Sequence, residues 1–142
     1  MKIEDIMTPE AHITTPDATV HDAAVIMSEN EVGILPVHQH DKLIGVITDR
    51  DIVRNVVAKG LNCDQPVQSA MTQDVLYCRA GDDAADVARN MADNAVRRLP
   101  VVNEDKRLVG MVSLADIAER SDASAAGRAL GGIAGEDTRK AA

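Results

Sequence analysis

Gly45-Val46-Ile47-Thr48-Asp49-Arg50-Asp51 has the side-chain pattern of an apolar strand that runs into the first turn of a helix. The same pattern returns later in the chain as Gly110-Met111-Val112-Ser113-Leu114-Ala115-Asp116. In both copies a hydroxyl residue stands three positions after the glycine, and an aspartate stands three positions after the hydroxyl residue. This repetition indicates that the chain is built from two copies of one structural unit.

The hydroxyl and carboxylate side chains of this pattern suit a nucleotide. Thr48 and Ser113 stand at or next to a helix N-cap, where hydroxyl residues are favoured. Residues three apart share a helix face, so Asp51 and Asp116 point the same way as the hydroxyls. Unpaired N–H groups in a first turn attract phosphate, and a carboxylate can accept two hydrogen bonds from a ribose diol. The alternative is that these residues only cap helices, but the repetition favours a ligand site.

Length, composition and charge narrow the classes of function. The 142 residues fit one domain of ordinary size, and a chain of this length buries about two-thirds of its unfolded surface. Tyr77 is the only aromatic residue, so the core is aliphatic. The formal net charge of -8 disfavours general affinity for nucleic acid or for an anionic membrane. A single aromatic side chain also excludes the stacking surfaces of single-strand binders.

The sequence indicates a cytoplasmic location. The start of the chain, Met1-Lys2-Ile3-Glu4-Asp5, lacks the apolar region of a signal peptide. No apolar run approaches the length that spans a membrane. We therefore expect a cytoplasmic protein without a membrane partner.

The cysteines and histidines do not indicate a metal site. Cys63 and Cys78 form neither a CxxC motif nor a Cys/His cluster with zinc spacing, so we predict two reduced thiols rather than a disulfide or a redox switch. His38-Gln39-His40 lies in a predicted turn between two strands. We interpret that stretch as a solvated hairpin.

Apolar spacing and helix-breaking residues divide the first half of the chain into short elements. Pro9 stops an opening helix, and Pro36 indicates a bulge or a sheet edge in an apolar strand. Thr19 is a predicted N-cap, and Gly60 is a predicted C′ residue. The expected elements are a helix over 3–8, a strand over 13–15, helices over 20–29 and 49–59, strands over 34–37 and 43–47, and a turn over 40–42. The helix over 49–59 is expected to bury a stripe of Val53, Val56 and Val57.

The second half repeats this order. Ala70-Met71-Thr72 corresponds to Ile6-Met7-Thr8, and Leu99-Pro100-Val101 corresponds to Leu35-Pro36-Val37. The expected elements are a strand over 75–78, a helix over 83–93 with Val87 and Met91 inward, strands over 99–102 and 108–112, and a helix from 114 to about 120. The remaining sequence is rich in Ala, Ser and Gly, and predicts a weak helix over 123–130 and a mobile tail from residue 131.

An internal repeat of this length means two copies of a unit with the order strand, helix, strand, strand, helix. A unit of about 50 residues is too small to bury its own apolar faces well. We therefore predict a mixed α+β fold in which two β-α-β-β-α repeats pack about a pseudo-twofold axis, with the Gly-to-Asp stretches in equivalent clefts between the two repeats. The predicted organisation is a first repeat over 1–60, a linker over 61–69, a second repeat over 70–120, and a short helix and mobile tail over 121–142.

These features together resemble a tandem pair of cystathionine-β-synthase (CBS) domains, a Bateman module of the stand-alone bacterial type. The resemblance rests on the Ile-Met-Thr opening and its second copy, the Leu-Pro-Val strands, and both Gly-x-x-Thr/Ser-x-x-Asp endings. It runs from about Ile3 to Arg120. It implies a cleft in each repeat for an adenosine-containing ligand, such as AMP, ADP, ATP, S-adenosylmethionine or NAD.

The resemblance also implies roles for residues at matching positions. Thr48 and Ser113 would contact phosphate or ribose. Asp51 and Asp116 would bind the ribose hydroxyls. Independently of the resemblance, Arg50 is either a further contact at the first site or a surface residue. The other implied cleft residues are Thr14, Thr15, Cys78 and Arg79 near the base or phosphate, Val37 and Val101 around the base, and Gly33, Ile34, Arg97 and Arg98 just before the Leu-Pro-Val strands.

The two halves differ where Arg97-Arg98 takes the place of Gly33-Ile34. Two adjacent arginines suit phosphate, because each guanidinium can bind it in bidentate fashion. The alternative is that one arginine pairs with a local acid such as Asp93 or Glu104. Neighbours on an extended segment point to opposite faces, so we expect only one arginine to reach the ligand. The two sites are predicted to differ in affinity.

The doubled motif predicts a non-enzymatic regulatory module that senses adenine nucleotides or the energy state. Binding shifts the arrangement of the repeats only if the ligand favours one arrangement. The sequence contains no Walker A loop, G-x-S-x-G or HExxH motif, which argues against an enzyme. A ligand-independent interaction or dimerisation scaffold is the alternative. The resemblance further implies a homodimer and a regulated protein partner, which the sequence does not identify.

Overall fold

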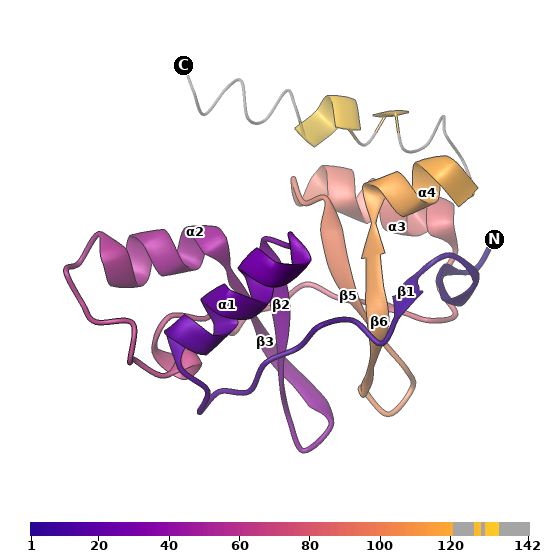
Figure 1. Ribbon diagram of the computed structural model, residues 1–142. Coiled ribbons are helices and arrows are strands. Elements are labelled where there is room, and N and C mark those ends of the chain that lie inside the picture. The colour runs from indigo at the N-terminus through magenta and orange to yellow at the C-terminus, as the bar shows by residue number, and fades with distance from the viewer. Residues whose placement is uncertain (121–126, 129, 134–142) are drawn as a thin grey trace. The chain divides into compact units, whose positions relative to one another are not determined.

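The computed structural model describes residues 1–120, 127–128 and 130–133. They form two compact units (Figure 1). The middle unit comprises His12–Val75, and the terminal unit combines Met1–Ala11 with the described residues from Leu76 onward. No described helix has both the length and the apolar character needed to cross a membrane. Each unit contains β-structure and helices, which confirms the mixed α+β class.

The middle unit is built on a β-hairpin. Its two strands pair antiparallel, with one helix before the hairpin and another after it. The second helix continues as a π-helical turn. In chain order the elements are α1 (Val20–Asn30), β2 (Ile34–Gln39), β3 (Lys42–Thr48), α2 (Asp49–Ile52), η2 (Val53–Val57) and the 3-10 turn η3 (Val67–Ser69).

The terminal unit contains a four-stranded sheet with the order β1-β6-β5-β4. Strand β6 pairs antiparallel with β1 and β5, and β4 runs parallel to β5. The middle unit has the same order of pairing, with isolated bridges at Thr72 beside β3 and at Thr14 beside β2 in place of the outer strands. The elements are η1 (Ile3–Asp5), β1 (Thr8–Pro9), β4 (Cys78–Arg79), α3 (Ala84–Asp93), β5 (Arg98–Val102), β6 (Leu108–Ser113) and α4 (Leu114–Arg120).

The opening segment of each repeat lies in the unit that holds the sheet of the other repeat. Thr8 of β1 pairs with Met111 of β6. Thr72 exchanges two backbone hydrogen bonds with Val46 of β3, at 2.8 and 3.0 Å. The predicted boundaries 1–60 and 70–120 assign each opening segment to its own repeat. In the structure, each opening segment belongs to the compact unit that contains the sheet of the other repeat.

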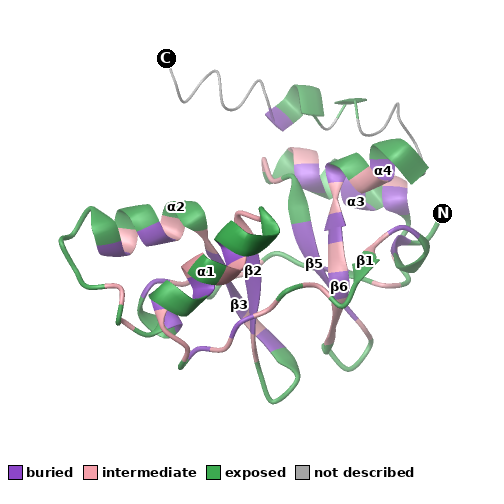
Figure 2. Cartoon of the chain, viewed as in Figure 1, coloured by how far each residue is buried: buried purple, intermediate pink, exposed green. Residues whose placement is uncertain are grey.

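Each unit has its own aliphatic core (Figure 2). The predicted inward stripes of the helices over 20–29 and 83–93 are confirmed, because Val20, Met27, Val87 and Met91 are all buried. The core of the middle unit consists of Val20, Ala23, Met27, Leu35, Val37, Ile47, Ile52, Val56, Val67 and Ala70. The core of the terminal unit consists of Ile3, Ile6, Cys78, Ala84, Val87, Ala88, Met91, Leu99, Val101, Val112, Leu114, Ile117 and Ile133.

The helix that follows β3 differs from its prediction in the face that it buries. Ile52 and Val56 are buried, whereas Val53 and Val57 are 55% and 59% exposed. The predicted stripe was wrong for Val53 and Val57, because a residue one position after an inward residue points roughly 100° away from it. Gly60 has a φ angle of +69°, as its predicted C′ position requires.

The turn of the β2–β3 hairpin is shorter than predicted. His40 and Asp41 have φ angles of +53° and +63°, which are typical of a two-residue type I′ turn. Residues 38–39 belong to β2, so their prediction as turn residues was wrong. The bulge that Pro36 indicated lies directly after Val37, where the register shifts.

The short elements near the repeat openings are shifted from their predicted positions. The opening helix is the 3-10 turn η1, and Thr8–Pro9 form a strand rather than the end of a helix. The strand predicted over 13–15 is reduced to the bridge at Thr14. The strand predicted over 75–78 begins at its last residue, as β4. Such two-residue strands depend on tertiary pairing, which the apolar spacing of a single segment does not report.

Part of the C-terminal segment is helical. Residues 127–128 and 130–133 have helical conformation. Ile133 is 2% exposed and belongs to the terminal core. The helical conformation therefore continues past the predicted end at residue 130. The predicted helix residues 123–126 and 129, and the predicted tail over 134–142, lie outside the described residues.

Candidate ligand-binding site

Thr48 and Asp51 form a capping box at the start of α2. The Thr48 hydroxyl accepts from the Asp51 backbone N–H at 3.0 Å, and Asp51 Oδ2 accepts from the Thr48 N–H at 3.0 Å. The Thr72 hydroxyl donates to the same carboxylate, at 3.4 Å from Oδ2 and 3.5 Å from Oδ1. The hydroxyl and the carboxylate therefore share one face of the first turn, where each satisfies a backbone donor.

Ser113 and Asp116 repeat this geometry at the start of α4. Ser113 Oγ accepts from the Asp116 N–H at 3.1 Å, and Asp116 Oδ2 accepts from the Ser113 N–H at 2.9 Å. An ionised carboxylate has about four acceptor positions, so one capping bond leaves others for further donors. Asp116 is half-buried. The cap thus fixes the direction of its carboxylate, and Asp116 does not itself line the cleft beside Ser113.

A cleft of about 440 Å³ opens in the terminal unit beside Ser113. This volume lies within the range that is usual for small-molecule sites, roughly 300–1,000 Å³. Its wall combines cationic, hydroxyl and apolar side chains. The lining residues are Arg97, Arg98, Ser113, Leu114, Ala115, Ala118, Gly127 and Leu130. Such a wall fits a ligand that joins an anionic group to an apolar body.

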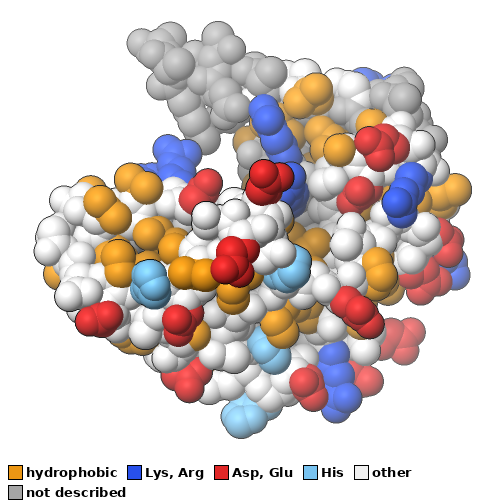
Figure 3. Space-filling model, viewed as in Figure 1, with side chains coloured by type: hydrophobic (Ala, Val, Ile, Leu, Met, Phe, Trp, Pro, Cys, Tyr) orange, Lys and Arg blue, Asp and Glu red, His pale blue; other side chains and the backbone are white. Residues whose placement is uncertain are grey.

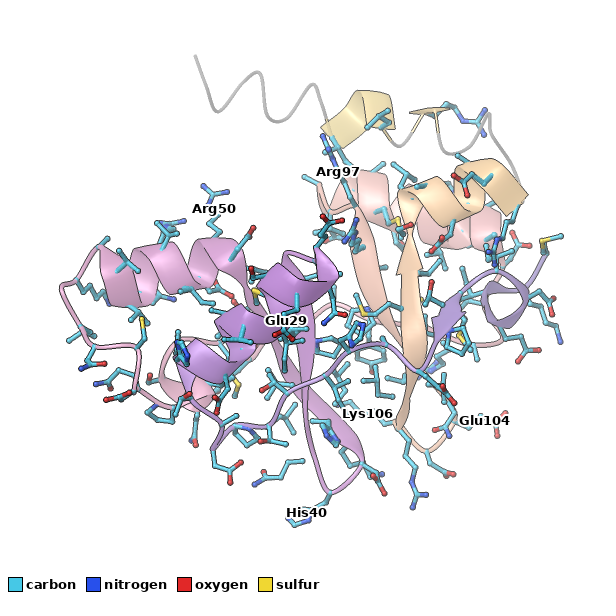
Figure 4. All side chains as sticks on the ribbon, viewed as in Figure 1. Glu29, His40, Arg50, Arg97, Glu104 and Lys106 are labelled. Carbon is cyan, nitrogen blue, oxygen red and sulfur yellow. The ribbon has the colours of Figure 1, made fainter. Side chains whose placement is uncertain are left out.

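Backbone hydrogen bonds hold Arg97 and Arg98 next to the start of α4. Arg98 pairs with Ser113 across the β5–β6 ladder, and the Leu114 N–H donates to the Arg97 carbonyl at 2.9 Å. Both arginine side chains are exposed, and both line the cleft. Figure 4 shows Arg97 on the side of the terminal unit that carries the helical C-terminal segment. Two guanidinium groups at one cleft suit a phosphate.

The middle unit repeats this backbone contact with different side chains. The Asp49 N–H donates to the Gly33 carbonyl at 2.9 Å. Asp49 Oδ2 lies 3.0 Å from the position that a Cβ atom would take on Gly33. Asp49 Oδ1 accepts from the backbone N–H of Arg50 at 2.8 Å. In the middle unit a carboxylate therefore lies beside Gly33. The second repeat has Arg97 at the position that corresponds to Gly33.

The charges near the two capping boxes have opposite balances. The middle unit places two carboxylates and one guanidinium there, from Asp49, Asp51 and Arg50. The terminal unit places one carboxylate and two guanidiniums there, from Asp116, Arg97 and Arg98. The exposed Arg50 side chain extends away from α2 (Figure 4). The charged residues at the capping box are therefore more cationic in the terminal unit than in the middle unit.

The other predicted site residues come from the strands. Thr14 is 5% exposed, Val37 and Val101 are fully buried, Thr15 is half-buried, and Arg79 is exposed. None of these five residues lines the cleft of the terminal unit. Their contact with a ligand remains a prediction.

The Cys78 thiol belongs to the terminal core. Its sulfur donates to the Pro100 carbonyl at 3.8 Å. Burial raises the pKa of this thiol to about 12, and the negative charge of Asp82 adds to the increase. Cys78 is therefore protonated at neutral pH, and its role as a ligand contact remains a prediction. Across the part of the chain that the structure describes, no three His, Cys, Asp or Glu side chains gather as a metal site.

Sequence reasoning missed the apolar part of the cleft wall. Ala118 of α4 stands four positions after Leu114 and three after Ala115, so it shares a helix face with each of them. That spacing was a usable signal. Gly127 and Leu130 come from a segment rich in Ala, Ser and Gly, whose composition carries no comparable pattern.

Comparison with known families agrees with this geometry. The CBS domain family model matches residues 3–58 and 67–122 of the chain. The matches include both capping boxes, so the two repeats are a pair of CBS domains. The chain belongs to the CBS domain family.

Three relatives show how far the similarity extends. The CBS domain-containing protein YhcV of Bacillus subtilis is 33% identical over 132 residues, which are 92% of this chain and 94% of YhcV. The structure of CBSX2, a protein of Arabidopsis thaliana, in complex with AMP has a TM-score of 0.72 and 29% identity over 83% of this chain and 93% of CBSX2. The CBS domain pair of MJ0100, in complex with 5′-methylthioadenosine and S-adenosylmethionine, has a TM-score of 0.72 and 27% identity over 84% of this chain and 94% of that pair.

Proposed function

We propose that this protein is a non-enzymatic regulatory module that binds AMP, ADP or ATP in the cleft of the terminal unit. The observation that carries the proposal is the meeting of Arg97, Arg98 and Ser113 at one cleft whose remaining wall is apolar. The structures of CBSX2 and MJ0100 support the ligand class, because AMP, 5′-methylthioadenosine and S-adenosylmethionine all contain adenosine.

Each part of the ligand has a partner in this proposal. The phosphate lies against the guanidinium groups, whose hydrogen bonds to an anion are charge-assisted. Asp116 accepts from the ribose hydroxyls with the acceptor positions that its cap leaves open. The base lies against the apolar side chains of α4. A phosphorylated ligand is favoured over S-adenosylmethionine, because two guanidinium groups repel a sulfonium cation.

The middle unit is proposed to bind the same class of ligand more weakly. Thr48, Asp51 and Arg50 are its candidate contacts. The Asp49 carboxylate beside Gly33 adds a second negative charge near this site. A phosphate is repelled by that charge, so the two sites of the chain differ in affinity.

The regulatory role follows from linkage between ligand and conformation. A ligand that fits one arrangement of the protein better than another increases the population of that arrangement. We propose that a homodimer of this chain reports adenine nucleotide levels to a protein partner in this way. The partner reads the change in surface, and no chemical turnover is required.

A ligand-independent dimerisation or interaction scaffold is the second candidate. The observation that favours it is the exposure of three apolar residues in the middle unit: Val53, Val57 and Leu61 are 55%, 59% and 48% exposed. Hydrophobic side chains are visible over α2 and α1 in Figure 3. A scaffold captures its partner equally well with and without a nucleotide, which separates it from a sensor.

Calorimetric titration with AMP, ATP, NAD and S-adenosylmethionine tests the proposal. The variant Asp116→Asn keeps an oxygen that can cap the Ser113 N–H but loses acceptor positions for ribose. We expect its AMP affinity to fall roughly 10-fold, since hydrogen bonds to a charged group are worth about 1.5–3 kcal/mol. The matched variant Asp51→Asn in the middle unit has a smaller effect. Absence of binding of all four compounds to the wild type at millimolar concentration contradicts the proposal and favours the scaffold.

A further inference from the structure

The apolar wall of the cleft extends beyond the second CBS domain. The family match ends at residue 122, yet Gly127 and Leu130 line the cleft together with the two arginines. Leu130 is 47% exposed, so about half of its surface is covered and the rest is accessible. The segment that follows the second repeat is therefore part of the candidate site.

Ile133 anchors this segment on the terminal unit. Its side chain is 2% exposed and belongs to the core that contains Met91 of α3 and Ile117 of α4. The neighbouring Gly132 lies against α3, since a Cβ atom on it would be 3.5 Å from Ala92 Cβ. Residues 130–133 are helical, so side chains three positions apart project from the same side of the segment. Docking of Ile133 into the core thus holds Leu130 at the cleft.

We propose that residues 127–128 and 130–133 form a ligand-dependent wall of the nucleotide site, in which Leu130 contacts the adenosine part of the ligand. This inference rests on the proposed function, because it concerns the same cleft. A ligand that contacts Leu130 binds the docked form of the segment more tightly than the undocked form. Ligand binding and docking of Ile133 therefore strengthen each other by the same factor.

The wall has two consequences for the site. Leu130 gives apolar contact to a nucleoside but nothing to a bare anion, so it distinguishes AMP from inorganic phosphate. Docking also links occupancy of the cleft to a segment outside the CBS repeats. The ligand therefore changes how firmly the C-terminal segment is held, in addition to any change within the repeats.

Calorimetric titration of the full chain with AMP tests the role of Leu130. The variants are Leu130→Ala and its matched control Leu76→Ala; Leu76 is 45% exposed in the same unit and does not line the cleft. Loss of apolar contact is expected to raise the Kd for AMP roughly 5-fold in Leu130→Ala. Leu76→Ala is expected to bind AMP like the wild type. Inorganic phosphate is expected to bind equally to all three proteins.

Hydrogen exchange of the wild type tests the docking itself. Saturation with AMP is expected to slow exchange of the amides of residues 127–128 and 130–133. Two results would overturn the ligand-dependent wall and leave the proposed function standing. One is unchanged exchange in this segment. The other is an unchanged Kd for AMP in Leu130→Ala while Arg98→Ala weakens AMP binding. Failure of the wild type to bind AMP, ATP, NAD and S-adenosylmethionine overturns both.

Discussion

The carbonyl oxygen of Thr8 lies 2.6 Å from the position that a Cβ atom would take on Gly110. Thr72 and Gly45 have the same relationship, also at 2.6 Å. In both cases the opening segment of one repeat lies against the strand that leads to the capping box of the other repeat. The glycine of the repeated Gly-to-Asp pattern is therefore required by the close approach of a backbone, because real Cβ atoms essentially never come closer than 3.0 Å.

Substitution of Gly110 by alanine is expected to destabilise the protein. The added methyl group meets a backbone oxygen, which cannot rotate away as a side chain can, so Gly110→Ala should lower the free energy of unfolding by about 1–3 kcal/mol. Urea denaturation measures this change. Gly81→Ala is the control, since a Cβ atom there has no neighbour within 4 Å. Equal stability of the two variants would contradict the argument.

Loss of the capping hydroxyl of Thr48 is expected to cost about 1 kcal/mol of stability, because an N-cap side chain satisfies an otherwise unpaired N–H group. Thr48→Ala removes the acceptor of the 3.0 Å bond from the Asp51 N–H. Thr48→Ser retains it. Chemical denaturation should therefore place the serine variant close to the wild type and the alanine variant below it. A serine variant as unstable as the alanine variant would show that the methyl group matters instead.

Local signals explain which parts of the fold could be predicted from the sequence. Thr19 accepts a hydrogen bond from the Asp22 N–H at 3.0 Å, so its predicted N-cap role is confirmed. The helix predicted over 83–93 is also confirmed, with Asp83 as its N-cap. Caps, turns and apolar spacing act within a few residues and can be recognised in one segment. The interchange of the opening segments depends on pairing across the chain, and neither Thr8 nor Thr72 carries a local signal for it.

The candidate site likewise combines residues that local signals predict with one residue, Leu130, that they do not predict. Ser113, Arg97 and Arg98 were predicted as site residues, and the structure brings them to one cleft. Their meeting follows from the hairpin, since Arg97 precedes β5, Arg98 begins β5 and Ser113 ends β6. Leu130 lies outside the repeat, and its place depends on burial of Ile133. An isolated Leu and Ile in a segment rich in small residues do not predict that contact.

The buried Cys78 thiol predicts a loss of stability at alkaline pH. Burial raises its pKa from 9.0 to about 12 in the folded protein. The thiol therefore ionises more readily in the unfolded chain, so its stabilising contribution is complete below pH 9 and is lost as the pH rises towards 12. In Cys78→Ala the free energy of unfolding should fall less steeply between pH 9 and 11 than in the wild type.

Urea denaturation across this pH range measures that slope. Val101→Ala is the control, because Val101 pairs with Cys78 between β4 and β5 and lies in the same core without a titratable group. It should lower the free energy of unfolding at every pH and keep the wild-type slope. Parallel curves for the wild type and Cys78→Ala would show that the thiol does not contribute.

The arginine pair predicts a binding loss that depends on the phosphate of the ligand. Arg98→Ala is expected to raise the Kd for AMP about 10-fold, since charge-assisted hydrogen bonds are worth roughly 1.5–3 kcal/mol. Arg98→Lys retains the charge but not the bidentate geometry, so its Kd should lie between those of Arg98→Ala and the wild type. Arg89→Ala is the control, because Arg89 pairs with Asp86 on the exposed side of α3. Titration with adenosine, which lacks a phosphate, should give the same Kd for all four proteins. If Arg98→Ala lost adenosine binding as strongly as AMP binding, the arginine would support the shape of the cleft rather than bind the phosphate.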